Sequence, residues 1–586
     1  MKKLLKSSLI ALMVATVATS VACDTKKDSS SAPEEQKIEY QKFVTNTIGF
    51  NDNSDPTLEE YNSQLYYLNQ WEKFESENIG FPDMGDPFIL YHEGYYYAYG
   101  TRGAQSFHCF RSEDLTHWTR LADCFTPLSD SWGRYDLWAP DIQQIDGKWY
   151  LYYTARCVNA DGSRNCQIGV AVAEHPAGPF VQFTGENANG EEITLERSSF
   201  TGLEGHTILD STVFQDDDGS LYMYFSYDAR TGSSEMRDRA KDDAVAEIWG
   251  VKLKDPVTWD LSTLTPLICP GYKNLQEEYP TISWERWSPS FDPIAGVECA
   301  EGPYMIKHNG TYYLTYCANS FVDCNYAVGY AVSDTPLGNY DKPKDYYLQN
   351  MILGVPSKPG EFLYNRYQGF TTGTGHAAIF KTASGELMFA YHAHYNRAEW
   401  NNGDYRSDWR ALAIDYLYFD ENGTPYANGP TYALTRTPED ISGYKDMIHN
   451  ATVKAECENV NYLTDNFTNR AYNTKEVARE ATFSAGTRSI EITFENPVTV
   501  KAINVYNSYD RSLAIEKITQ IDFGQGRGIV NACFNERYLS KRFADFINPH
   551  SAFNIELDDE LLTNRIVITV TSEFDFALGE IEIIGK

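Results

Sequence analysis

Five stretches of the chain share one pattern of apolar and polar positions, in which a short apolar run leads into a turn that ends in Gly and an aromatic-rich run follows. A Gly-containing turn between two such runs predicts a β-hairpin, because both central residues of a type I′ turn need positive φ. The turn glycines recur at intervals of roughly 50 to 90 residues, which is enough for a four-stranded sheet and its loops. The pattern therefore predicts a five-bladed β-propeller, with turns at Gly94, Gly147, Gly219, Gly310 and Gly385.

A distinctive side chain opens the apolar run of every copy. It lies nine residues before the turn glycine, or eight in the first copy, at Asp86, Trp138, Asp210, Glu301 and His376. The innermost strand of each propeller blade faces a shared axis. We therefore expect these five side chains to converge in one funnel.

Three carboxyl groups in one funnel indicate glycoside hydrolysis. Cleaving a glycosidic bond with inversion needs two carboxyl groups roughly 6.5–9.5 Å apart, one that protonates the leaving oxygen and one that activates water. A third carboxylate can hold the pKa of the acid high, because like charges disfavour ionisation. Blades that face one another across a funnel can provide this separation.

Beyond about residue 450 the chain alternates between apolar and polar residues at period two, as in 500–506 and 564–570. This alternation predicts a separate β-sandwich. The domain resembles the discoidin-like, galactose-binding class of jelly rolls in its Thr-Asp-Asn start at Thr464 and its closing strand 579–585. The predicted fold class is all-β, a five-bladed β-propeller followed by a jelly-roll β-sandwich. The second domain either binds sugar or only supports the propeller.

The N-terminus has the pattern of an export signal. Residues 1–23 contain lysines near the start, an apolar run up to Val21, then small residues and Cys23. This run is too short for a stable membrane span and is typical of a secretory signal. The ending Ser20-Val21-Ala22-Cys23 resembles a bacterial lipobox, so we expect a lipidated Cys23; ordinary cleavage after Ala22 is the alternative.

The remaining chain divides into three parts. Residues 24–45 are charged and Ser-rich and predict a flexible tether. The propeller domain is expected at 46–445 and the discoidin-like sandwich at 450–586. The protein is therefore expected to be exported and anchored by lipid in a bacterial envelope, on its periplasmic face or at the cell surface.

Charge and composition restrict the ligand. The formal net charge is −33, and no basic run follows the signal, which argues against nucleic acid because phosphate backbones need Lys and Arg. The chain contains 42 Tyr, 30 Phe and 11 Trp. Most of these aromatics are expected to fill the sheet cores. The others suit neutral ligands with apolar faces, among which sugars are the obvious candidates.

The cysteines allow several disulfide pairings, and the sequence does not decide between them. Apart from Cys23 the chain has ten, an even number that is compatible with disulfides in an exported protein. The pairs Cys157 with Cys166, Cys317 with Cys324 and Cys109 with Cys124 are close enough in sequence to be candidates. None of the cysteines has the spacing of a zinc finger, so a zinc site is not expected.

Five ordered motifs carry a family resemblance over about residues 80–432. They read GDPFIL, LWAPDIQQIDGKWYLYYT, ILDSTVFQDDDGSLYMYF, AEGPYMIKHNGTYYLTY and TGTGHAAIF. They resemble the glycoside hydrolases of family 43, five-bladed propellers that cleave arabinose- and xylose-containing glycans with inversion. The resemblance implies that Asp86 is the general base, Asp210 the pKa modulator and Glu301 the general acid.

Further residues are assigned from the resemblance and from the repeat itself. In the family the His that matches His376 lies near the axis and in several members binds calcium or another ion, partly through water, which makes His376 a candidate calcium ligand; a hydrogen bond to an axial water is the alternative. Trp138 is expected to form an aromatic wall for the sugar, and Arg410, at the start of the last inward strand, to contact the substrate or a carboxylate. Asp141, three residues after Trp138, is expected to point to the other face of its strand and to be structural.

These expectations combine into an exported, lipid-anchored inverting glycosidase that acts on oligo- or polysaccharides and requires no cofactor. An exo-acting α-L-arabinofuranosidase is the first hypothesis, since long insertions such as 184–206 and 270–298 tend to close one end of a funnel. The alternatives are a β-D-xylosidase, an endo-arabinanase, an exo-galactosidase or a non-catalytic glycan-binding lipoprotein. Three carboxylates in one funnel argue against a pure binder.

Overall fold

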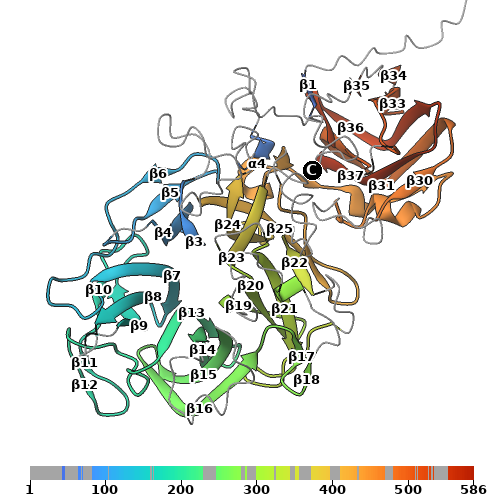
Figure 1. Cartoon of the computed structure of the whole chain (residues 1–586). Helices are drawn as coiled ribbons and strands as arrows, with labels where there is room; N and C mark the ends of the chain where they lie inside the picture. Colours follow the sequence, from blue (N-terminus) through green and yellow to red (C-terminus); the bar gives the residue numbers. More distant parts are fainter. Residues whose placement is uncertain are drawn as a thin grey trace, which may run out of the picture.

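The structure is a computed structural model that describes the chain in ranges. They are 42–45, 64–67, 69, 82–102, 105–158, 162, 164–228, 246–278, 284–286, 299–321, 325–343, 350–354, 371–395, 410–431, 434–468, 479–508, 510, 512–524, 527–528, 532–533 and 552–586. The regular structure in these ranges is almost entirely β-strand. None of their helices has the length and apolar character needed to cross a membrane. The strands form a propeller and a C-terminal sandwich (Figure 1).

Five four-stranded antiparallel sheets surround one axis, which confirms the predicted five-bladed propeller (Figure 1). The first strands of consecutive blades are neighbours, and β23 closes the circle against β3. In chain order the blades consist of β3 (Gly85–His92), β4 (Tyr95–Thr101), β5 (Phe110–Ser112) and β6 (Thr119–Arg120); β7 (Tyr135–Ile145), β8 (Lys148–Val158), β9 (Arg164–Ala173) and β10 (Val181–Gln182); β13 (Thr207–Gln215), β14 (Leu221–Asp228), β15 (Glu247–Asp255) and β16 (Thr258–Ile268); β19 (Ala300–His308), β20 (Thr311–Ala318), β21 (Ala327–Ser333) and β22 (Met351–Leu353); β23 (Thr371–Lys381), β24 (Leu387–Tyr395), β25 (Ala411–Phe419) and β26 (Pro425–Ala427).

The repeated hairpins have two kinds of turn. In blades 1, 2 and 4 the turn has two residues, both with positive φ, as at Glu93 (48°) and Gly94 (90°). In blades 3 and 5 the strands are joined by five residues, 216–220 and 382–386, and the glycine is the fourth of them. The predicted hairpin is confirmed in every copy, but the turn length is not constant.

Each pair of neighbouring blades shares a cluster of buried apolar side chains, so five clusters separate the five blades. Tyr97 of blade 1 and Leu151 of blade 2 belong to one of them, and Ile89 of blade 1 and Phe380 of blade 5 to another. Burying one such side chain stabilises the fold by about 1.5–3 kcal/mol. The aromatic second strands thus hold the blades together, as expected for most of the Tyr and Phe residues.

Short elements connect the blades to one another and to the rest of the chain. Two small hairpins lie at the periphery, and one short strand before the propeller pairs with one after it. These elements are β11 (Gly185–Glu186) with β12 (Glu192–Ile193), β17 (Tyr272–Asn274) with β18 (Glu277–Glu278), β2 (Tyr66–Tyr67) with β27 (Thr435–Arg436), and the 3-10 helix η2 (Trp284–Arg286).

The C-terminal domain is built on two long strands, β31 (Gly486–Asn507) and β36 (Ala552–Ser572), which pair antiparallel. Shifts in the pairing register near Val498 divide β31 and β36 into two halves each. The two halves of each strand pair with different neighbouring strands. The halves enclose one buried apolar cluster, as the predicted β-sandwich requires. The other elements are β29 (Ala451–Ala455), β30 (Ala481–Phe483), β32 (Lys517–Ile518), β33 (Gln520–Asp522), β34 (Arg527–Gly528), β35 (Ala532–Cys533), β37 (Phe576–Gly585), η4 (Ile448–Asn450) and η5 (Val460–Leu463).

The domain limits differ by a few residues from the predicted ones. β28 (Lys445–Asp446) already pairs with β37, so the sandwich begins before residue 450. β1 (Lys42–Thr45), the end of the predicted tether 24–45, pairs with β36. A short segment with β-branched residues can add to such a strand edge. The signal 1–23, with Cys23, lies outside the described residues.

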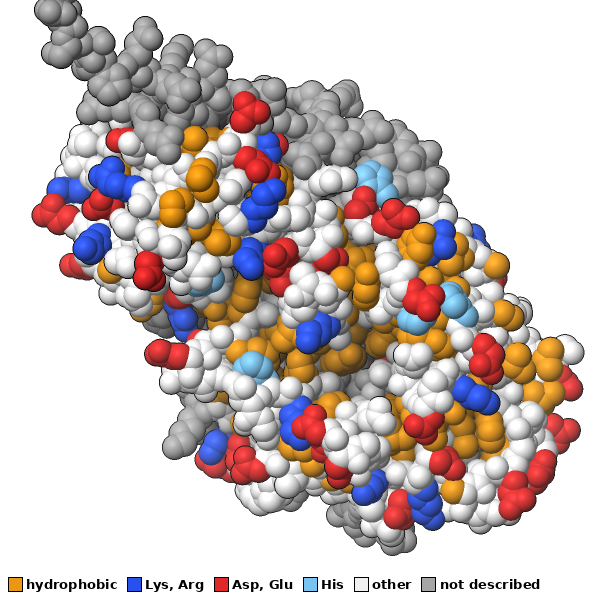
Figure 2. Space-filling model, turned by 180° about the vertical axis from the view of Figure 1, so that it is seen from behind, with side chains coloured by type: hydrophobic (Ala, Val, Ile, Leu, Met, Phe, Trp, Pro, Cys, Tyr) orange, Lys and Arg blue, Asp and Glu red, His pale blue; other side chains and the backbone are white. Residues whose placement is uncertain are grey.

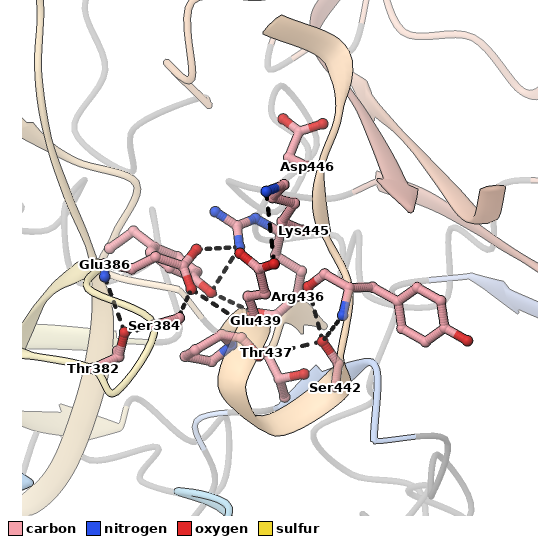
Figure 3. A network of polar contacts seen from close by, with 12 residues as sticks. Thr382, Ser384, Glu386, Arg436, Thr437, Glu439, Ser442, Lys445 and Asp446 are labelled. Carbon is pink, nitrogen blue, oxygen red and sulfur yellow. Dashed lines mark hydrogen bonds and ion pairs between the residues drawn. The ribbon is translucent and has the colours of Figure 1, made fainter. Parts of the chain in front are cut away.

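The two domains meet around Arg436, which is buried (Figure 3). Its guanidinium pairs with Glu386 of the propeller at 2.7 Å and with Glu582 of the sandwich at 3.4 Å. It also lies over the ring of Tyr416, 4.2 Å from the centroid. Glu386 accepts a hydrogen bond from the backbone of Glu439, the first residue of α4 (Glu439–Ser442). One cation therefore ties both domains and the segment that joins them.

The face shown in Figure 2 has no continuous stripe of Lys and Arg side chains. Lys and Arg side chains are scattered there among Asp and Glu (Figure 2).

Candidate active site

A β-bulge interrupts the first strand of every blade near the axis, where pairing with the second strand stops and then resumes. One residue within each bulge has positive φ. These residues are Asp86 (49°), Ala139 (48°), Asp210 (56°), Gly302 (57°) and His376 (47°). Four of them carry a side chain, although L residues rarely adopt this conformation. Such strain is typical of functional sites.

The bulges correct the predicted register of Glu301 and Trp138. Both are the last paired residue before the bulge, so they are equivalent to Gly85 and not to Asp86. The count from the turn glycine failed because the turns differ in length. The bulge residue lies eight residues before the glycine where the turn has two residues, as from Asp86, and nine where it has five, as from Asp210.

Asp86 is held as a carboxylate by its neighbours. Arg410 Nη1 donates to its Oδ1 at 2.7 Å, and His376 Nδ1 lies 3.3 Å from the same oxygen. The Thr101 hydroxyl adds a hydrogen bond. Burial works to raise the pKa of Asp86, but the charges of Arg410 and His376 and these hydrogen bonds outweigh it, and the pKa lies below its ordinary value. Asp86 is therefore ionised over most of the pH range.

Asp210 and Glu301 hold a proton more tightly than ordinary carboxyls. Burial, the charge of Glu301 and the charge of Asp86 raise the pKa of Asp210 well above its usual value. Burial raises the pKa of Glu301 to about 7, against hydrogen bonds from Tyr326 and Cys299. The two groups are near enough to repel when both are ionised. The same site thus contains one ionised carboxylate and a protonated carboxyl group.

His376 lies between the carboxylates, with Nδ1 3.3 Å from Asp86 and 3.9 Å from Asp210. Burial lowers its pKa. Among the described residues, no three His, Cys, Asp or Glu side chains are arranged to share a metal ion. Calcium takes six to eight oxygen ligands. A calcium ion beside His376 therefore stays a prediction that depends on carbonyls and water.

Trp138 of β7 has a cationic neighbour. Trp138 is partly exposed, and the guanidinium of Arg156 lies 5.0 Å from its ring centroid. Arg156 pairs with Asp136 at 3.0 Å. Tyr135, three residues before Trp138, is 43 % exposed. Trp138 is thus available as an apolar wall for a sugar ring.

Arg410 fits closely against the backbone of Gly85, next to Asp86. Its Cζ lies 2.1 Å from where a Cβ on Gly85 would be, so only glycine admits the guanidinium there. The same guanidinium lies 5.0 Å from the ring centroid of Phe321, which is 40 % exposed. Arg410 was predicted to contact either the substrate or a carboxylate, and in the structure it contacts the Asp86 carboxylate.

Comparison with known proteins identifies the family of this site. The family model described as Glycosyl hydrolases family 43 matches residues 79–425, which include the whole propeller site. The chain belongs to glycosyl hydrolase family 43.

Relatives of this family 43 enzyme have several activities in their names. The "Beta-D-galactofuranosidase xynD" of Aspergillus niger is 25% identical over 330 residues, which is 54% of this chain and 72% of that protein. The "Xylosidase/arabinosidase 43A" of Humicola insolens is 29% identical over 191 residues, 32% of this chain and 51% of that protein. Among solved structures, a thermostable family-43 glycoside hydrolase is 26% identical and covers 61% of this chain and 96% of that chain, with a TM-score of 0.46.

In the family 43 enzyme Asp141 is structural, as predicted. It is buried, and its carboxylate accepts hydrogen bonds from the Val213 backbone at 2.8 Å and from Gln143 at 2.8 Å. Burial raises its pKa to about 7. It joins the first strands of blades 2 and 3 and does not line the group around Asp86.

A set of second-strand residues in the family 43 enzyme was not predicted from the sequence. Each lies opposite the last paired residue before a bulge, and we call these the axial acceptor positions: Thr101, Thr154, Ser226, Cys317 and His392. A signal was present, because four of them directly follow an aromatic residue in the repeated second strand. Tyr326, which bonds Glu301, comes after that strand and had no signal in the repeat.

Cys109, Cys124, Cys157 and Cys166, which make up two of the three candidate pairs, are free thiols. Cys157 and Cys166 cannot pair across β8 and β9, because Cys157 lies opposite Asn165 and Cys166 opposite Arg156, which places the two thiols on different faces of the sheet. Cys109 and Cys124 are both buried thiols. Cys324 lies outside the described residues, so its pairing with Cys317 is not addressed.

Proposed function

We propose that this family 43 enzyme is an inverting, exo-acting α-L-arabinofuranosidase that trims side chains of plant polysaccharides. The observation that carries the proposal is the contrast between two carboxyl groups of one site, with the pKa of Asp86 lowered and that of Glu301 raised to about 7. Inverting glycosidases need this pair, one base and one acid. Relatives named for furanosidase activity support the choice of sugar.

Asp86 and Glu301 divide the proton transfers. Asp86 takes a proton from a water molecule, whose oxygen forms the new bond to the anomeric carbon. The bond from that carbon to the leaving oxygen breaks, and Glu301 gives its proton to the leaving oxygen. Glu301 is partly exposed, whereas Asp210 is buried, so Glu301 is the carboxyl that can reach a substrate oxygen. Proton return from Asp86 through water completes the cycle.

The other side chains support this pair. Asp210 is the pKa modulator: it and Glu301 repel when both are ionised, so the pair retains a proton. Arg410 keeps Asp86 ionised and fixes its direction. Trp138 provides the apolar face against which the sugar packs.

Export, anchoring and glycan capture belong to the same proposal. The signal 1–23 directs export, and lipidation at Cys23 anchors the enzyme in the envelope membrane. The discoidin-like sandwich binds glycan near the propeller. Two relatives are named extracellular enzymes, which supports export of this chain.

A panel of substrates tests the proposal. Aryl α-L-arabinofuranoside, aryl β-D-xyloside, aryl β-D-galactofuranoside and linear arabinan would be incubated with wild type, Asp86→Asn and Glu301→Gln, with Glu93→Gln as control because Glu93 is 78% exposed. We expect release from the arabinofuranoside, lost in both site variants and kept in the control. Release only from the xyloside or galactofuranoside, or internal cleavage of arabinan, would select one of the alternative activities. Binding without any release would leave a glycan-binding lipoprotein.

A further inference from the structure

The axial acceptor positions form a repeated contact between neighbouring blades. The backbone N–H of a bulge residue donates to the axial acceptor side chain of the preceding blade. Ala139 donates to Thr101 Oγ1 at 2.9 Å and Asp210 to Thr154 Oγ1 at 2.8 Å. In the same way His376 donates to Cys317 Sγ at 2.8 Å, and Asp86 donates to His392 Nδ1 at 3.2 Å.

Blade 3 departs from this pattern. Ser226 Oγ is buried without a hydrogen-bond partner among the residues that the structure describes. The Gly302 amide, which the pattern would direct to Ser226, instead bonds the carboxyl group of Asp210. Ser226 thus occupies an axial acceptor position without its contact and offers a matched control for the others.

His392 differs from the other axial acceptors because it carries an aromatic ring. The ring is fully buried and lies nearly parallel to the ring of Tyr326, with centroids 5.5 Å apart and planes inclined by 10°. The backbone of Gly375, opposite His392, gives Tyr326 its place, since a Cβ there would lie 2.1 Å from the ring. Tyr326 in turn hydrogen-bonds Glu301.

The tautomer of His392 follows from its contacts. Nδ1 accepts the Asp86 N–H, so the proton of the neutral ring is on Nε2. Nε2 has no partner among the described residues, although it is buried. A buried donor without a partner is destabilising, which calls for a compensating role.

We propose that His392 is a positioning residue for the glycosidase reaction, which ties the backbone of Asp86 to Tyr326 and through it to Glu301, and so fixes the separation of base and acid. The proposal rests on the proposed function. A displacement of about 1 Å of a catalytic group can cost about a hundredfold in rate. A single stacked pair of rings that contacts both groups is suited to prevent such a displacement.

Two substitutions of His392 separate its hydrogen-bond acceptor from its stacked ring. His392→Phe keeps the ring over Tyr326 and loses the acceptor, whereas His392→Asn keeps an acceptor and loses the ring. We expect each to lower kcat by about 10- to 100-fold with KM changed less than about threefold. His392→Asn should also move the basic limb of the pH profile to higher pH, because the Tyr326 hydrogen bond lowers the pKa of Glu301. His392→Phe should leave that limb in place.

Controls separate positioning from folding. Ser226→Ala should keep wild-type kcat, and thermal melting of all variants checks the fold. If the His392 variants do not fold, Tyr326→Phe carries the test, since it removes only the hydroxyl that bonds Glu301 and should itself move the basic limb upward. Wild-type kcat and pH profile in Tyr326→Phe, or kcat within twofold of wild type in both His392 variants, would overturn the proposal. A folded wild type that cleaves none of the glycosides would instead overturn the proposed function.

Discussion

The guanidinium of Arg410 occupies the space that a side chain on Gly85 would need, with Cζ 2.1 Å from the position of a Cβ. From this place Arg410 Nη1 donates to Asp86 Oδ1 at 2.7 Å. Gly85 therefore leaves room for the ion pair that keeps Asp86 ionised. Glycine is needed there for close approach and not for its φ, since Gly85 is absent from the positive-φ residues.

Gly85→Ala tests this relationship. The flexible end of Arg410 can move away at small cost, so the protein should fold, but Asp86 should lose the contact. Because burial raises the pKa of Asp86 and Arg410 is the largest opposing influence, the acid limb of kcat/KM should move to higher pH. The rate at the optimum should fall about tenfold to a hundredfold. Steady-state kinetics across pH measure both.

Gly205→Ala is the matched control for Gly85→Ala. No atom lies within 4 Å of its added Cβ, and its φ is ordinary for an L residue. Kinetics and melting should equal those of wild type. An unchanged acid limb in Gly85→Ala, beside an unchanged control, would contradict the role given to Arg410.

The pH profile of the wild type follows from the two carboxyl groups. Glu301 must be protonated, so the basic limb of kcat/KM should lie near pH 7, the value of its pKa. Asp86 must be ionised and its pKa is below the usual value of about 4, so activity should persist to below about pH 4. A basic limb above about pH 9 would show that another group is the acid.

How far the sequence predicts this site depends on what repeats. The Gly-containing turns and aromatic strands recur because every blade needs them, so the hairpins, the five blades and the residues Asp86, Asp210 and His376 could be found from the pattern. Turn length does not recur, because two-residue and five-residue connections both join two antiparallel strands. Glu301 was therefore found one residue out of register, although it reaches the same funnel.

Contacts between side chains of different blades could not be predicted from the sequence. Tyr326 and His392 come from different blades, and their stacking depends on the absence of a side chain at Gly375. No local propensity encodes such a contact. The junction at Arg436 is similar, since its two carboxylate partners are separated by almost 200 residues of chain, from Glu386 to Glu582.

Arg436→Gln should destabilise the protein, because it leaves Glu386 and Glu582 without their shared cation in a buried junction. Removing one partner of a buried ion pair costs about 3 kcal/mol or more. Urea denaturation should show this loss. In the control Arg565→Gln, the broken pair with Glu491 is 43% exposed on both sides, so the loss should stay below about 1 kcal/mol. Equal losses in both variants would contradict the importance of the junction.

Stability should fall as the pH rises from about 5 to 8. Burial first, and neighbouring acids second, raise the pKa of Glu580 well above its usual value, and burial raises the pKa of Asp446 and Asp465 to about 6. These groups bind protons more tightly in the folded than in the unfolded state. Their contribution is complete below about pH 4 and is lost as the pH passes the folded pKa values. Melting temperatures across pH measure this slope.

Glu580→Gln should make the slope shallower, because the amide does not titrate. The variant should gain most over the wild type at pH 8 and least at pH 5. A melting temperature of the wild type that rises from pH 5 to pH 8 would contradict the assignment of these carboxyls as protonated groups.

The configuration of the first product tests the central claim most directly, that Asp86 activates water on one side of the sugar while Glu301 protonates the leaving oxygen on the other. Proton NMR during hydrolysis of an aryl α-L-arabinofuranoside follows the released sugar before its anomers equilibrate. The β anomer should appear first, and the α anomer only later by mutarotation. An α anomer that appears first would contradict the paired base and acid.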